Sequence, residues 1–138
     1  MYKFYHVISD MIKYNQCKRA GVTQMLISYF YLRQNDTLLE ALINDDEIEV
    51  IVDSGLYSYS NSVKITEKEV KEYSEEYISF ITKYEHYHCF KGFFELDFDL
   101  IGYDYRTFVK PYQDRLLSVT NKMILICQKK RTSATPYP

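Results

Sequence analysis

The sequence predicts an α/β fold: a parallel sheet of about five strands joined by crossover helices. Short apolar, β-branched runs alternate with helical segments along the 138 residues. Several of these runs are apolar throughout, which is typical of strands that are covered on both faces. Because the strands follow one another with short connections and no obvious switch point, the pattern favours a half-TIM-barrel-like winding over a doubly wound open sheet.

The first half of the chain contains three expected strands and two helices. Residues 3–8 form a short strand, and residues 9–20 form a helix that ends before Gly21. Residues 25–32 are almost entirely apolar and predict a buried strand. A capping box of Thr37 and Glu40 predicts the start of a short helix, and residues 49–53 form the third strand.

The second half opens with the clearest helix. Thr66 and Glu69 form a capping box, and large apolar side chains then recur at helical spacing on one face. A fourth strand lies within residues 89–100, and a fifth strand spans 123–127. Between them, residues 105–119 form a helix that contains Pro111, so we expect a kink or a break near Lys110. We therefore expect one domain over residues 1–128 and a basic, flexible tail over 129–138.

The charge is distributed unevenly along the chain. Residues 36–99 hold sixteen Asp or Glu and five Lys, a balance of −11, whereas the whole chain has a net charge of −2. Direct nucleic-acid binding is therefore not expected. The acidic block is either a solvated helix face balanced by basic neighbours or an acidic docking surface formed by Glu72, Glu75 and Glu76. Fifteen Tyr favour recognition, although AT-rich coding sequence would also enrich Tyr.

Other sequence signals argue against several classes of protein. No apolar run reaches the length of a membrane span, and no segment is typical of a secretory signal. Three widely spaced Cys suit reduced thiols, so we expect a cytoplasmic protein, in the host cell if it is phage-encoded. Gly-rich phosphate loops and complete metal-ligand sets are missing. We therefore expect neither a metal nor a cofactor.

The candidate site residues lie where two expected strands end. Asp53 ends the third strand and precedes a Ser54-Gly55 turn. Glu95, Asp97 and Asp99 are spaced by two at the end of the fourth, which would place them on one face. Grouped carboxylates can act as acid and base, bind a hard metal, or accept the N–H edge of a purine. Alternatively, Asp97 and Asp99 have left the strand and cap the next helix or a turn through Gly102.

Two short motifs carry a family resemblance. Asp-Ser-Gly-Leu-Tyr-Ser at residues 53–58 and Glu-Leu-Asp-Phe at residues 95–98 resemble phage-encoded TIM-barrel proteins similar to tRNA-guanine and DNA 7-deazaguanine transglycosylases. The resemblance covers residues 1–127, the N-terminal half of such a barrel. It implies that Asp53 contacts a base, that Leu56 crowds the base where the family has Gly or Ala, and that the second catalytic Asp and the zinc site are missing.

Two functions follow as expectations. A half-barrel leaves strand edges and an inner face uncovered, so we expect a homo-oligomer or a binding partner. The leading hypothesis is a phage-derived, anti-CRISPR-like inhibitor that docks its acidic, Tyr-rich surface on a host nucleic-acid-processing defence enzyme, a basic protein. The alternative is a reduced transglycosylase-like enzyme or deazapurine-binding protein, with Asp53 and Asp97 in a site completed across a homodimer.

Overall fold

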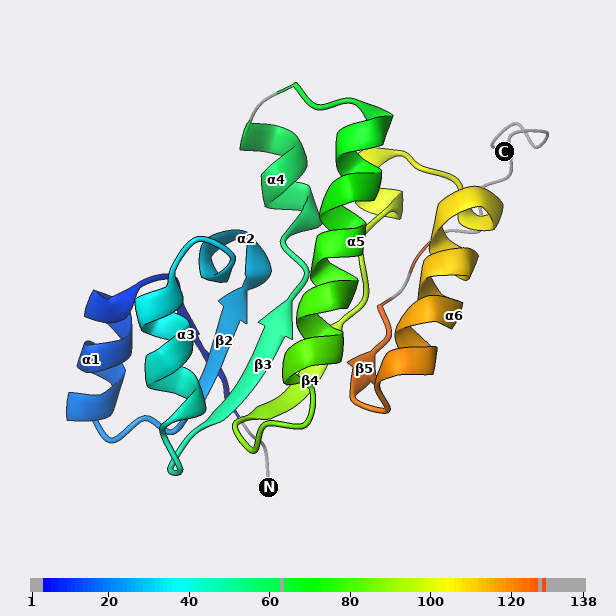
Figure 1. Ribbon diagram of the computed structural model, residues 1–138. Coiled ribbons are helices and arrows are strands. Elements are labelled where there is room, and N and C mark those ends of the chain that lie inside the picture. The colour runs from blue at the N-terminus through cyan, green and yellow to red at the C-terminus, as the bar shows by residue number, and fades with distance from the viewer. Residues whose placement is uncertain (1–3, 63, 127, 129–138) are drawn as a thin grey trace.

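The fold is a five-stranded, all-parallel sheet whose spatial order is the order of the sequence (Figure 1). The computed structural model describes residues 4–62, 64–126 and 128. Each strand pairs with the next in parallel register, and no reversal of order occurs. This confirms the predicted α/β class and its half-barrel winding. The strands are β1 (His6–Ile8), β2 (Gln24–Ser28), β3 (Glu49–Asp53), β4 (Phe90–Phe94) and β5 (Met123–Ile124).

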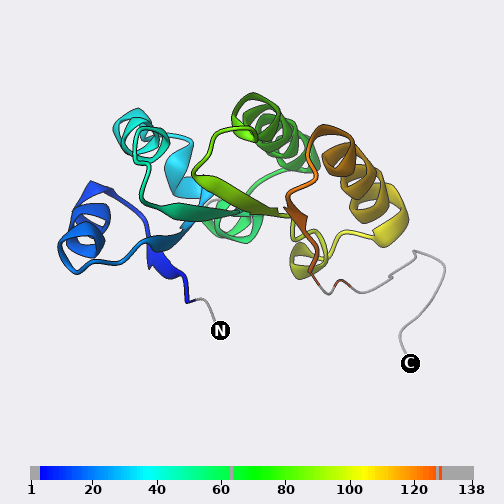
Figure 2. The same cartoon turned by 90° about the horizontal axis from the view of Figure 1, so that it is seen from below.

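Helices follow the strands and cover one face of the sheet. Figure 2 shows α1, α3, α5 and α6 side by side along that face, whereas α4 and the 3-10 helix η1 meet at the carboxyl ends of the strands. The helices are α1 (Met11–Arg19), α2 (Tyr29–Leu32), α3 (Asp36–Ile43), α4 (Leu56–Ser62), α5 (Glu67–Tyr84) and α6 (Lys110–Val119), with η1 at Asp99–Ile101 and a π-helix η2 at Tyr105–Val109. None of the described helices is long and apolar enough to cross a membrane.

The hydrophobic core lies between the sheet and these helices. Alternate strand residues such as Ile27 and Val52 are fully buried, and so is the predicted apolar face of α5. The opposite face of the sheet also carries apolar side chains: Val7 pairs with Leu26, which pairs with Ile51. Val7 is 70% exposed, and no helix of the described residues runs along this face (Figure 2). One face of the sheet is thus buried while the other stays open.

Three expected boundaries differ from the structure. The strand expected over residues 25–32 ends at Ser28, whose hydroxyl accepts a hydrogen bond from the Phe30 N–H at 3.2 Å and so begins α2. Asn35, not a Thr37 capping box, caps α3 through a 3.0 Å bond from the Leu38 N–H. The fifth strand covers only 123–124. Near Lys110, where a kink or a break was expected, the chain stays helical but changes from the π-helix η2 to the α-helix α6.

The end of the fourth strand requires a correction that bears on the site. β4 ends at Phe94, and the Glu95 N–H still donates to the Ile124 carbonyl, but the chain then leaves the sheet. Glu95, Asp97 and Asp99 therefore do not alternate along one strand. Instead, the Leu100 N–H donates to the Asp97 carbonyl and the Gly102 N–H donates to the Asp99 carbonyl. The alternative turn through Gly102 is therefore confirmed. The tail expected over 129–138 lies outside the described residues.

The turn after β3 packs tightly against the end of β2. Gly55 has a φ of +70°, a backbone conformation that side chains disfavour. A Cβ built on Gly55 would lie 2.4 Å from the Ser28 Oγ and 2.7 Å from the Phe30 N. Only glycine therefore fits here, and the close contact fixes the position of Asp53 relative to β2.

We predict that Gly55→Ala destabilises the protein much more than Gly21→Ala. Gly21 also has a positive φ, at 76°, but a Cβ there would meet no atom within 4 Å. Gly21→Ala should cost about 1–2 kcal/mol for the left-handed conformation alone, and the steric overlap at Gly55 should add to that cost. Urea unfolding of both variants measures the difference. Equal losses would contradict the close packing at Gly55.

Candidate functional site

Two aspartates from adjacent strands come together at the carboxyl edge of the sheet. Asp53 is the last residue of β3, and its carboxylate accepts a 3.2 Å hydrogen bond from the Gly55 N–H. Asp97 lies three residues beyond β4, is only 9% exposed, and interacts electrostatically with Asp53. The structure therefore brings the two predicted acid residues into one site, although Asp97 reaches it from a loop rather than from a strand.

The environment of these carboxylates favours their protonated forms. Burial raises the pKa of Asp97 to about 7, and the negative charges of Asp53 and Glu95 contribute to the shift. Burial also raises the pKa of Asp53, while the Gly55 and Ser54 N–H groups oppose that rise. No described residue donates a hydrogen bond to the Asp97 carboxyl. At neutral pH the pair can therefore hold one proton, and can both accept and donate hydrogen bonds.

Two buried tyrosines of α5 hold the loops that carry the aspartates. The Tyr73 hydroxyl donates to the Ser54 carbonyl at 2.7 Å, and the Tyr77 hydroxyl donates to the Phe94 carbonyl at 2.7 Å. The sequence indicated these residues only as an apolar helix face. The available signal was the residue type, because a buried Tyr needs a partner for its hydroxyl where a Phe would not.

The other predicted carboxylates have structural positions. Glu95 is 1% exposed, and it accepts hydrogen bonds from the Gln113 and Gln128 side chains and from the Ile126 N–H at 2.8 Å. It thereby ties the end of β4 to α6 and to the chain after β5. Asp99 begins η1, and its N–H donates to the Gln128 side chain. No cluster of three or more His, Cys, Asp or Glu within the described ranges could hold a metal ion.

Two further predicted site residues form the turn itself. Ser54 is fully buried and uses its carbonyl to bind Tyr73, while Gly55 supplies the close contact with β2. Leu56, which the resemblance implies would crowd a bound base, is the first residue of α4 and is fully buried in the hydrophobic core.

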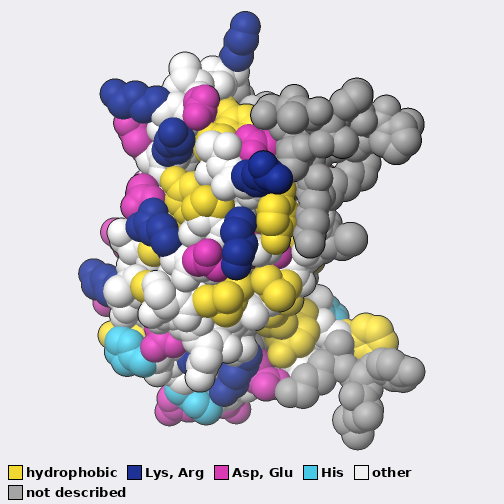
Figure 3. All heavy atoms as spheres, turned by 90° about the vertical axis from the view of Figure 1, so that its right-hand side faces the viewer, with side chains coloured by type: hydrophobic (Ala, Val, Ile, Leu, Met, Phe, Trp, Pro, Cys, Tyr) yellow, Lys and Arg dark blue, Asp and Glu magenta, His cyan; other side chains and the backbone are white. Residues whose placement is uncertain are grey.

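The predicted acidic docking residues all lie on α5 but contact different neighbours. Glu76 accepts two hydrogen bonds from Arg33, at 2.7 and 2.9 Å, and Glu75 forms an ion pair with Arg115. Glu72 is exposed and lies 3.8 Å from Lys68. On the side formed by α6, Lys and Arg are interspersed with Asp and Glu (Figure 3). Basic neighbours thus balance much of the acidic block.

We predict that Asp97→Asn stabilises the protein increasingly as the pH rises from about 4 to about 7. In this window the folded state keeps the Asp97 proton while the unfolded chain, with a pKa of 3.8, loses it, so the wild type loses stability. The free energy of unfolding of the variant minus that of the wild type should grow by about 1.4 kcal/mol per unit of raised pKa. Urea titrations across this range measure it, and a pH-independent difference would contradict the assignment.

Comparisons with known proteins add no assignment to this site. No protein-family model, no curated protein and no solved structure matches the chain. The resemblance of residues 53–58 and 95–98 to the transglycosylase-like barrel proteins therefore stays a prediction.

Proposed function

We propose that the protein binds a small molecule with adjacent N–H donors, such as a guanine-like or deazapurine base, at the carboxyl edge of its sheet. The observation that carries this proposal is the pairing of Asp53 with Asp97, a buried carboxyl with no hydrogen-bond donor among the described residues. A bound N–H donor would form a charge-assisted hydrogen bond with an ionised carboxylate at this position.

The protonation of the pair suits the edge of such a base. An ionised carboxylate accepts two N–H groups at once, as guanine offers with its ring N–H and amino group. The neighbouring carboxyl, if it keeps its proton, donates to a carbonyl or ring nitrogen of the ligand. The same pair could serve as general acid and base in a transglycosylase-like reaction. Base binding is the minimal function that the geometry supports, and catalysis would build on it.

The open face of the sheet supports a homodimer as the binding form. Val7, Leu26 and Ile51 offer apolar surface beside the site, and a second copy would remove it from water. It would also supply the far wall that a half-barrel lacks around its carboxyl edge. The mass of the protein in solution, with and without base, reports whether dimerisation and binding are coupled.

We predict that guanine and 7-deazaguanine bind the wild type and that Asp53→Asn and Asp97→Asn each weaken binding at least tenfold. Each variant replaces one of the two carboxyl oxygens by an NH2 group, which donates instead of accepting and cannot take up or release the proton that the pair holds. Isothermal titration calorimetry at neutral pH measures the affinity. Asp46→Asn is the matched control, because Asp46 is exposed at the opposite edge of the sheet.

The Asp46→Asn control shows whether a loss of base binding is specific to Asp53 and Asp97. Asp46→Asn should bind the bases like the wild type, and all three variants should give the circular dichroism spectrum of a folded protein. If no base binds the wild type, or if Asp53→Asn and Asp97→Asn bind as tightly as Asp46→Asn, the proposal is wrong.

The second candidate is the anti-CRISPR-like inhibitor of a host defence enzyme. Exposed aromatic side chains favour this candidate, because Tyr31 and Tyr57 are 47% and 48% exposed. The uncovered face of the sheet favours it as well. Of the three acidic docking residues, Glu72 has its negative charge least neutralised, because its basic neighbour Lys68 lies 3.8 Å away whereas Glu75 and Glu76 each pair closely with an arginine. Such a surface would compete with nucleic acid for a basic channel, and its affinity would fall with salt.

For this candidate we predict that Glu72→Lys lowers protection of a phage from CRISPR interference at least tenfold, in a plaque assay on a host with an active system. Glu40→Lys on α3 is the control, because it makes the same charge change at another exposed position. Glu76→Lys is unsuitable, since it would break the ion pair with Arg33. Equal protection by wild type, Glu72→Lys and Glu40→Lys would contradict the acidic docking surface.

A further inference from the structure

The chain that follows β5 returns to the loop that carries Asp97. The Gln128 side chain donates a hydrogen bond to the Glu95 carboxylate and accepts one from the Asp99 N–H at 3.2 Å. Asp97 lies midway between Glu95 and Asp99 in the sequence. Gln128 is therefore tied to both sides of the Asp97 loop, and the residues that follow Gln128 start there.

The two aspartates and this part of the chain lie on the same side of the sheet. Ile51 and Asp53 alternate along β3 with the fully buried Val52, so they belong to the uncovered face. Figure 2 shows the chain after β5 turning toward that face. The residues that follow Gln128 therefore start on the side from which Asp53 can be reached.

The charges of the aspartates and of the following segment are complementary. Within residues 4–62, 64–126 and 128, no Lys or Arg forms an ion pair with Asp53 or Asp97. The pair keeps a negative charge even when it holds one proton. Residues 129–138 contain no Asp or Glu, and they begin with three consecutive basic residues, Lys129, Lys130 and Arg131.

The basic residues are close enough in sequence to reach the pair. An extended chain spans at most about 3.6 Å per residue, so Arg131 lies no more than about 11 Å along the chain from Gln128. Its guanidinium can donate to two carboxylates at once, which would offset the repulsion between Asp53 and Asp97. Because the segment is covalently tethered, its effective concentration at the pair is high, and weak contacts suffice.

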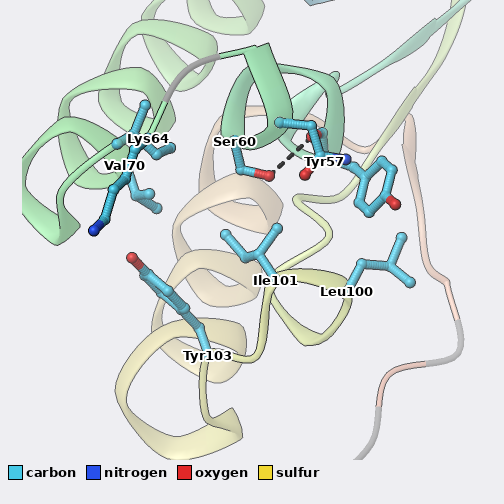
Figure 4. Close-up of a pocket in the computed structure, with 9 residues that line it drawn as sticks. Tyr57, Ser60, Lys64, Val70, Leu100, Ile101 and Tyr103 are labelled. Carbon is cyan, nitrogen blue, oxygen red and sulfur yellow. Dashed lines mark hydrogen bonds between the residues drawn. The ribbon is translucent and has the colours of Figure 1, made fainter.

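Exposed apolar side chains flank the same region. Leu100 and Tyr57 are 62% and 48% exposed, and both line a pocket of about 290 Å³ between α4 and η1. In Figure 4 the two side chains lie on the same side of that pocket. Leu100 directly follows Asp99, the residue that Gln128 contacts. Later residues of the segment, such as Tyr137, would find apolar contact area here.

We propose that residues 129–138 dock on this chain's own aspartate pair, with the basic residues 129–131 against Asp53 and Asp97. The segment then covers the site in the ligand-free protein, and a ligand must displace it. The docking stands independently of what the site binds. The competition with a base, in contrast, rests on the proposed function.

Release of the segment by trypsin tests the docking in the full-length protein, because trypsin cleaves after Lys and Arg and a docked segment is protected. We predict that Asp53→Asn and Asp97→Asn each speed the release at least about threefold, the effect of losing one partly exposed charged contact. Asp46→Asn should leave the rate unchanged. High salt should speed the release from the wild type but not from the Asp53→Asn/Asp97→Asn double variant. Mass spectrometry measures the rates.

Two further measurements separate docking from a general loss of stability. Cleavage after Lys71, within α5, reports unfolding and should stay slow in every variant. Lys129→Gln/Lys130→Gln leaves the aspartates intact and should speed cleavage after Arg131, relative to a synthetic peptide with the same substitutions. If this double variant and both aspartate variants release the segment at the wild-type rate, the docking is wrong.

Base affinity tests whether the docked segment covers the site. Replacing residues 129–131 by Gln should tighten guanine binding at least about threefold in calorimetric titrations, because a competing intramolecular contact is lost. The charge-matched control is Lys13→Gln/Arg19→Gln/Lys83→Gln, at exposed helix positions. If both variants bind guanine like the wild type, the segment does not cover the site. If guanine binds to none of the proteins, the proposed function fails, while the trypsin result decides the docking by itself.

Discussion

The site depends on two hydrogen bonds that join α5 to the ends of the central strands. Tyr73 and Tyr77 are buried in the middle of the core and donate to the carbonyls of Ser54 and Phe94. These carbonyls belong to the positions where the chain leaves β3 and β4. Because the two tyrosines lie one helical turn apart, one rigid helix sets the spacing of both exits. The relative position of Asp53 and Asp97 follows from that spacing.

The same helix takes part in two networks that differ in their exposure. On its inner side, the hydroxyls of the tyrosines are hydrogen-bonded within an aromatic cluster. On its flanks, Glu76 and Glu75 form ion pairs with Arg33 and Arg115, which come from α2 and α6. The Arg33 guanidinium also stacks over the Tyr59 and Tyr73 rings, with its Cζ 5.3 and 5.0 Å from the two ring centroids. The acidic residues of α5 therefore help to join neighbouring helices as well as to shape the surface.

Local sequence signals predicted what local interactions determine. The capping box of Thr66 and Glu69 forms as expected, because its two residues are three apart in sequence. β3 spans the predicted residues, because its short apolar, β-branched run is typical of a buried strand. The apolar run over residues 25–32 led to the wrong prediction of one long strand, because such a run fits a strand and a buried helix equally well. The ion pair of Arg33 with Glu76 spans 43 residues, and no local pattern could have predicted it.

The edge strands are much shorter than the strands between them. β1 has three residues and β5 has two, whereas β2, β3 and β4 have five each. Short edge strands expose few unpaired backbone N–H and C=O groups, which limits the addition of strands from other molecules at the sheet edges. Two molecules that paired edge to edge, as one continuous sheet, would therefore gain few hydrogen bonds. Face-to-face packing is the more favourable geometry for pairing two copies.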